Sequence, residues 1–161
     1  MDAALEKIQH ELMLRGWKDI TAATVGDTPY DLVASRRFLL SKWRILIRRI
    51  SHFNGEGGQQ FALDVKKVTS GSKLLLTASR FIFCVVADKV DPTIKELIGL
   101  ESAGIKKYVK FRGGRGHFLV LDLANKEITG RVPILPYDAH TFVGQLHTIL
   151  NQLGALPQRR I

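Results

Sequence analysis

The chain has few of the features by which a protein of its size is usually assigned. Only one of its 161 residues is a cysteine, Cys84, and it lies within the apolar run FIFCVV. One thiol cannot form an internal disulfide, so a disulfide-stabilised scaffold is excluded. In such a run the thiol is expected to be a small buried side chain rather than a reactive nucleophile. The composition therefore suits a reducing, cytoplasmic environment.

Long hydrophobic runs are also missing. No apolar stretch approaches the roughly 20 residues needed to span a bilayer. The opening segment, MDAALEKIQHEL, contains acids and lacks the apolar core of a secretory signal. We therefore expect no membrane partner. A hydrophobic content of 45% is enough for an ordinary core, and the length predicts a single domain over residues 1–161.

Cofactor and catalytic motifs are scarce as well. The segment 53–58 is rich in glycine. It does not match a Walker A motif, because Gln59 and Gln60 follow where that motif needs Gly-Lys-Ser/Thr. It does not match the dinucleotide-binding motif G-x-G-x-x-G either, because it contains only G-x-G-G. No histidine or cysteine pair has metal-ligand spacing, and G-x-S-x-G is absent. We expect no resident metal or organic cofactor, and we interpret residues 51–58 as a flexible glycine-rich loop.

What the chain does have is positive charge, concentrated in two blocks. Its 24 lysines and arginines against 15 acids give a net charge of +9. Residues 1–31 carry three bases and six acids, a balance of −3, whereas residues 32–54 carry six bases and no acid and residues 104–116 carry five bases and no acid. Blocks of this kind most often meet a phosphate backbone. An acidic protein, a membrane surface, or a basic surface kept for solubility are the alternatives.

The hydrophobic periodicity predicts a mixed α/β domain. Apolar residues at i, i+3 and i+7 predict a helix over 2–15, and alternation along Trp43–Ile50 predicts a strand with arginines on one face. The continuous apolar run 81–87 is typical of a strand covered on both faces. The other expected elements are strands at 20–25 and 30–34, a helix at 59–69, a short helix opened by Pro92, strands at 105–111 and 117–123 joined as a hairpin through RGGRG, and a closing helix at 137–153.

The order helix, three strands, helix, strand favours a particular resemblance. Residues 29–33 read PYDLV and residues 42–48 read KWRILIR. Together with the element order, these segments make residues 1–90 resemble the core of the restriction-endonuclease-like (PD-(D/E)xK) superfamily, with residues 91–161 as an extension. The resemblance implies that Asp31 matches the metal-binding Asp of the family, that Arg48 matches its Lys, and that Glu11 lies where some members carry a further acid.

The same alignment places Leu46 where the family has an acid. These nucleases hold Mg²⁺, which requires oxygen ligands, to activate water. A leucine supplies no ligand, and arginine stays protonated and cannot act as a base. The resemblance therefore implies a degenerate, non-catalytic member, with Mg²⁺ as a cofactor only if activity survives.

The sequence thus predicts a nucleic-acid-binding protein without catalysis. An active metal-dependent nuclease using Asp31 with Arg48 and either Glu11 or Asp64 is one alternative, and an assembly subunit that pairs with itself or another protein is a second. The residues expected to contact nucleic acid are Arg36, Arg37, Arg44, Arg48, Lys106, Lys110, Arg112 and Arg115.

Overall fold

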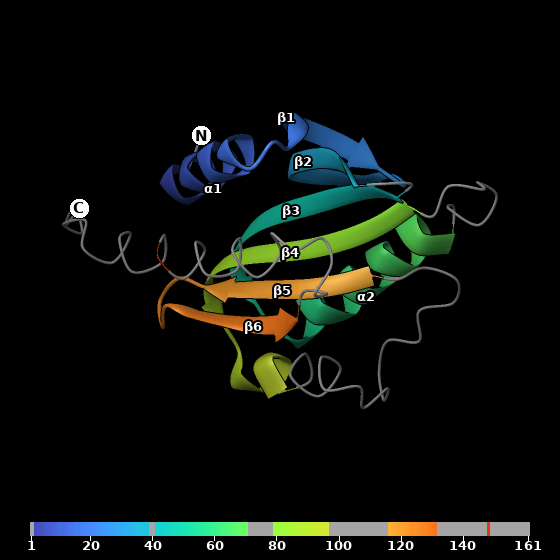
Figure 1. Ribbon diagram of the computed structural model, residues 1–161. Helices are drawn as coiled ribbons and strands as arrows, with labels where there is room; N and C mark the ends of the chain where they lie inside the picture. Colours follow the sequence, from blue (N-terminus) through green and yellow to red (C-terminus); the bar gives the residue numbers. More distant parts are fainter. Residues whose placement is uncertain (1, 39–40, 71–78, 97–115, 132–147, 149–161) are drawn as a thin grey trace.

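The computed structural model describes residues 2–38, 41–70, 79–96, 116–131 and 148. Two helices and six strands are assigned within these ranges (Figure 1). In chain order they are α1 (Ala3–Leu14), β1 (Lys18–Val25), β2 (Thr28–Phe38), β3 (Ser41–Phe53), α2 (Gly55–Ser70), β4 (Ser79–Val90), β5 (Gly116–Asp122) and β6 (Glu127–Arg131). Residues 92–96 add a short helical turn.

The six strands form one mixed sheet in which sequence neighbours are also spatial neighbours, from β1 to β6. The first three strands are an antiparallel meander, β3, β4 and β5 run parallel, and β6 returns antiparallel. Parallel neighbours need a crossover connection, and α2 supplies it between β3 and β4. The expected mixed α/β class is therefore confirmed.

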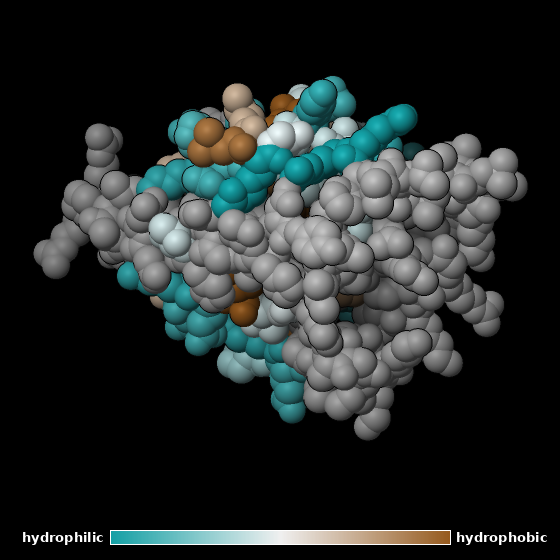
Figure 2. Space-filling view, viewed as in Figure 1, coloured by the Kyte–Doolittle hydropathy of each residue, from teal (hydrophilic) through white to brown (hydrophobic). Residues whose placement is uncertain are grey.

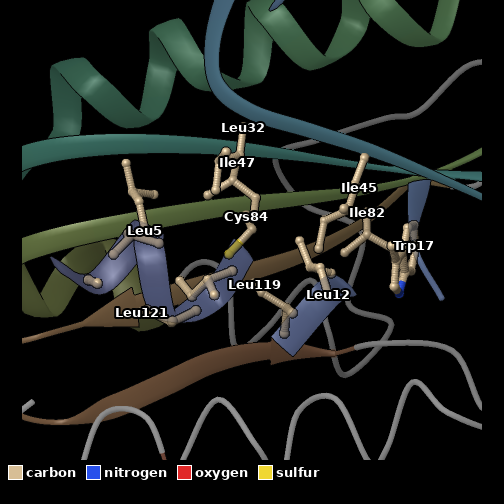
Figure 3. Packing of buried hydrophobic residues seen from close by; sticks show 14 of the residues in the cluster. Leu5, Leu12, Trp17, Leu32, Ile45, Ile47, Ile82, Cys84, Leu119 and Leu121 are labelled. Atoms are coloured by element: carbon tan, nitrogen blue, oxygen red, sulfur yellow. The ribbon is translucent and has the colours of Figure 1, made fainter. Parts of the chain in front are cut away.

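Helix α1 covers one face of the sheet. Asp2 caps it by accepting a hydrogen bond from the backbone N–H of Ala4 at 2.9 Å. Its buried stripe then packs on alternate residues of β2, β3, β4 and β5, as Figure 3 shows from close by. This cluster includes Leu5, Ile8, Leu12, Trp17, Leu32, Trp43, Ile45, Ile47, Ile82, Cys84, Leu119 and Leu121.

Helix α2 lies on the opposite face. Asn54 caps it through its side-chain oxygen, which accepts from the N–H of Gly57 at 2.9 Å. Phe61 makes ring contacts with Phe53, Phe83 and Phe118, and so joins α2 to three strands. Residues of β4 alternate between the two clusters, so this strand is buried on both sides as its sequence predicts.

Several sequence predictions are confirmed and two need correction. Trp17, Trp43 and Cys84 are core residues, and burial raises the pKa of the Cys84 thiol to about 12. The expected loop at 51–58 is wrong, because β3 continues to Phe53 and α2 begins at Gly55. The Asn54 cap satisfies the first turn despite its glycines, whose helix propensity is low.

The expected hairpin partner of the strand at 117–123 is the second correction. The segment 105–111 lies outside the described residues, but Phe118–Asp122 is already paired with β4 on one side and β6 on the other. The hairpin that follows β4 is therefore built from β5 and β6. A turn in which Asp122 accepts from the N–H of Asn125 at 3.2 Å connects them. The expected closing helix at 137–153 also lies outside the described residues. No helix in the described ranges is long and apolar enough to cross a membrane.

Candidate functional site

The hairpin of β2 and β3 gathers basic side chains on the face of the sheet that α2 also covers. Arg37 pairs directly with Lys42, and Arg44 pairs with Ser35, whose other neighbour is Lys18 of β1. Paired residues share a face, as the burial of Val33 and Leu46 in the α2 cluster confirms for this register. Lys18, Arg37, Lys42 and Arg44 therefore lie on one face, and we call these four residues the basic face.

The spacing of the basic face follows from sheet geometry. Lys42 and Arg44 are two residues apart on one strand, about 7 Å, and directly opposite Cβ atoms lie about 5 Å apart. Lys18, Arg37 and Lys42 are exposed and Arg44 is half-buried. The acid nearby is Asp19, which accepts a hydrogen bond from the Ser35 hydroxyl at 3.1 Å. Within the described ranges no carboxylate pairs with the four cations.

Other arginines of the same sequence block point elsewhere. Arg36 pairs with Trp43, a residue of the α1 cluster, so Arg36 lies on the opposite face from Arg37. The Arg49 side chain also lies on the α1 face, where its guanidinium forms ion pairs with Asp2 at 3.2 Å and with Asp88. Its pKa is raised because these hydrogen bonds and charges outweigh the opposing effect of burial. The basic block of the sequence is therefore divided between two faces.

Arg48 lies on the α2 side but is engaged within the protein. Its Nη1 donates to Oδ2 of Asp64 at 2.7 Å, and Gln60 donates from Nε2 to the other carboxylate oxygen at 2.9 Å. The Asp64 side chain is 5% exposed and that of Arg48 is 29% exposed. This arrangement fastens α2 to β3 through a nearly buried ion pair.

Tyr30 lies beside this ion pair. Its hydroxyl is buried and has no hydrogen-bond partner among the described residues. Burial and the negative charge of Asp64 raise the pKa of Tyr30 to about 12, with Arg48 acting in the opposite direction. The phenol is thus a neutral, unsatisfied group in the core under α2.

Asp31 occupies an irregular position of β2. Between the pairs Thr21↔Val33 and Ala23↔Tyr30, one residue of β1 lies opposite two of β2, Asp31 and Leu32, so β2 bulges there. The carboxylate is exposed and accepts from the backbone N–H of Arg49 at 2.6 Å. The Glu11 carboxylate lies 3.9 Å from the guanidinium of Arg15, the C-cap residue of the same helix. Asp31, Arg48 and Glu11 therefore have three different sets of partners.

These residues do not fit a Mg²⁺ ion. Leu46, at the position of the family's acid, is fully buried in the α2 cluster, and Asp64 is held by Arg48 and Gln60. Among the described residues no three acids, histidines or cysteines come close enough to hold a metal. Asp31 would supply one carboxylate, and Mg²⁺ needs more oxygen ligands than that.

A second ionic cluster links the turn of residues 92–96 to the β5–β6 hairpin. Lys95 Nζ lies 2.6 Å from Asp122 Oδ2 and 2.7 Å from Glu127 Oε2. Burial alone would raise the pKa of Asp122, but hydrogen bonds from Lys95 and Asn125 and the charge of Lys95 hold it below its usual value. Each of these charged groups is satisfied, so the cluster is a structural fastening.

Four of the expected contact residues, Lys106, Lys110, Arg112 and Arg115, lie outside the described residues. Among the rest, Lys18 and Lys42 were missed by the sequence reasoning, because neither belongs to a recognisable motif. The alternation of Lys42, Arg44 and Leu46 along β3 was the available signal for Lys42. No protein family, no curated protein and no solved structure matches this chain.

Proposed function

We propose that this domain binds nucleic acid through the phosphate backbone, with the basic face as its main contact, and that it does not cut its ligand. Lys18, Arg37, Lys42 and Arg44 would contact phosphates, and Arg48 would stay in its internal ion pair. Recognition of this kind depends on charge and carries little sequence information.

The observation that carries the proposal is the direct cross-strand pair of Arg37 and Lys42. Like charges directly opposite each other destabilise a sheet. Lys18 and Arg44 add further positive charge to the same face. Anionic groups spaced along a backbone would relieve this repulsion, and a nucleic acid carries them at high density. The net charge of +9 would also speed the encounter.

The element order supports the resemblance to the restriction-endonuclease-like superfamily. Helix α1, strands β1–β3, helix α2 and strand β4 follow each other in the order expected of that core. The position of Leu46 and the engagement of Asp64 support the non-catalytic form of the proposal.

Salt dependence tests the proposal. The affinity of the whole chain for labelled duplex DNA and RNA would be measured by fluorescence anisotropy over a range of salt concentrations. The test variant is Arg37→Gln/Lys42→Gln/Arg44→Gln. Each lost phosphate contact should reduce the slope of log K against log salt by about 0.9 on B-DNA, so by about 2.7 for three contacts.

The matched control makes the same charge change elsewhere: Lys7→Gln on α1, Lys89→Gln at the far end of β4, and Lys126→Asn in the β5–β6 turn. We expect the control to keep the wild-type slope. Equal slopes for the two triple variants would refute the basic face as the contact. Metal-dependent cleavage of plasmid DNA that is lost in Asp31→Ala would instead establish the nuclease alternative.

A further inference from the structure

The sheet has two edge strands, and they differ in how well they are protected from pairing with another chain. Strand β6 has five residues, and Gly130 within it has φ +126°. Strand β1 has eight residues and no proline. It bulges between Lys18 and Thr21, where Asp19 has φ +54°, but Thr21, Ala22 and Thr24 beyond this bulge are exposed. Within the described ranges β2 is the strand hydrogen-bonded to β1, and no described strand pairs with the other edge of β1, which we call its open edge. Natural proteins usually protect such an edge.

The hairpin between β1 and β2 fixes which backbone groups face this open edge. Gly26 and Asp27 both have positive φ, as a two-residue type I′ turn requires, so Val25 and Thr28 form a hydrogen-bonded pair. The next pair, Thr24↔Pro29, is not hydrogen-bonded, and Pro29 has no N–H to donate. The N–H and C=O of Thr24 therefore point away from β2, and by alternation those of Ala22 do too.

We propose that the open edge of β1 pairs antiparallel with β1 of a second copy of this chain. Around a two-fold axis at Ala23, Ala22 of one copy lies opposite Thr24 of the other, and the outward backbone groups of both exchange hydrogen bonds. Ala23 meets its own counterpart at the close, non-hydrogen-bonded position, where a methyl group fits. The two sheets become one continuous sheet.

Charge favours a second copy at this edge rather than at the rest of the surface. Residues 1–31 carry a balance of −3 in a chain of net charge +9, so two copies repel each other least here. Lys18 and Asp19 lie at one end of β1, and antiparallel pairing places those of the two copies at opposite ends.

Exposed apolar surface beside β1 is an independent observation for the same interface. Met13 and Leu14 are the last two residues of α1, and they are 59% and 66% exposed. Strand β1 begins four residues after Leu14. Figure 2 shows a brown group over α1 next to the hydrophilic surface of β1 and β2. A two-fold axis perpendicular to the sheet keeps both α1 helices on one side and both basic faces on the other, which doubles the charge presented to a polyanion.

Light scattering and sedimentation of the full chain over a concentration series test the interface, which does not depend on polyanion binding. Thr24→Pro removes an outward N–H without breaking the pairing with β2, and proline is tolerated at such edge positions. Thr24→Ala is the control. We expect the wild type and Thr24→Ala to dimerise with rising concentration and Thr24→Pro to remain a monomer with a wild-type circular dichroism spectrum.

A wild type that stays monomeric, or a Thr24→Pro chain that still dimerises, would overturn the inference. Amide hydrogen exchange keeps the test decisive even if Thr24→Pro fails to fold. In the wild-type chain the amides of Ala22 and Thr24 should become protected as concentration rises, while that of Lys89, an exposed residue of β4, should not respond. Exchange at Ala22 and Thr24 that is independent of concentration would contradict the proposed edge.

Discussion

Replacing Arg48 separates a structural role for this residue from a role in binding. Arg48→Met keeps the apolar stem and removes the guanidinium, which leaves the Asp64 carboxylate buried with Gln60 as its remaining hydrogen-bond donor among the described contacts. Breaking a buried pair by removing one partner costs about 3–5 kcal/mol. Since the Arg48 side chain is 29% exposed, we expect the lower end, about 3 kcal/mol. That corresponds to a fall in Tm of roughly 6–12 °C for a chain of this size.

Urea denaturation and thermal melting would measure this loss. Arg48→Met/Asp64→Leu replaces both charges with apolar groups and should recover most of the stability, because no unpaired charge remains. Nucleic-acid affinity should be the same in the wild type, the single variant and the double variant. If Arg48→Met kept wild-type stability and bound nucleic acid more weakly, Arg48 would belong to the binding face and the ion pair would not fasten α2.

Three further expectations concern single residues, one in the core and two in the β5–β6 hairpin. Tyr30→Phe removes a buried hydroxyl that lacks a partner, so the free energy of unfolding should stay equal or rise by about 1 kcal/mol. Absorbance titrations of the wild type and of Tyr30→Phe should differ by one phenol that ionises near pH 12. The pKa of Asp122 is lowered on folding, so its contribution to stability is complete above the ordinary Asp pKa of about 3.9 and is lost as the pH falls below it. Asp122→Asn should therefore be less stable than the wild type at neutral pH, and its free energy of unfolding should fall less on acidification. Parallel loss at every pH would disprove the linkage. Gly130→Ala brings a Cβ to 2.1 Å from the carbonyl oxygen of Phe118. Gly16 also has a positive φ, +76°, but a Cβ there meets nothing within 4 Å, so Gly130→Ala should lower the melting temperature far more than Gly16→Ala. Equal melting temperatures of the two variants would contradict this expectation.

Elements with a clear hydrophobic period could be predicted from the sequence. The helix at 2–15 and the arginine-bearing face of the third strand came from spacing alone, because burial of one face imposes those periods. The third strand is longer than expected at both ends, since Ser41, Lys42 and His52 carry no apolar signal. Strand β6 was missed for the same reason, because EITGR contains one large apolar residue and a glycine.

The surroundings of the candidate site were harder to predict, because the ion pair that keeps Arg48 out of the basic face joins distant segments. Arg48 and Asp64 are sixteen residues apart, and nothing in the spacing shows that they meet. One signal was available: Asp64 falls on the apolar stripe of Phe61, Val65 and Val68, where a charge requires a buried partner. The division of the basic block between two faces was already implied by strand alternation, but assigning the faces required the register of β2 against β3.

The position of β4 has a consequence for synthesis on the ribosome. The meander β1–β3 can assemble from local contacts as soon as residue 53 has emerged, but the thirteen-residue edge of β3 then waits for β4, which is complete only at residue 90. During that interval a long strand edge has no intended neighbour, and its unpaired backbone groups can pair with another nascent chain. Slower translation of residues 54–90 should therefore increase the aggregation of newly made chains.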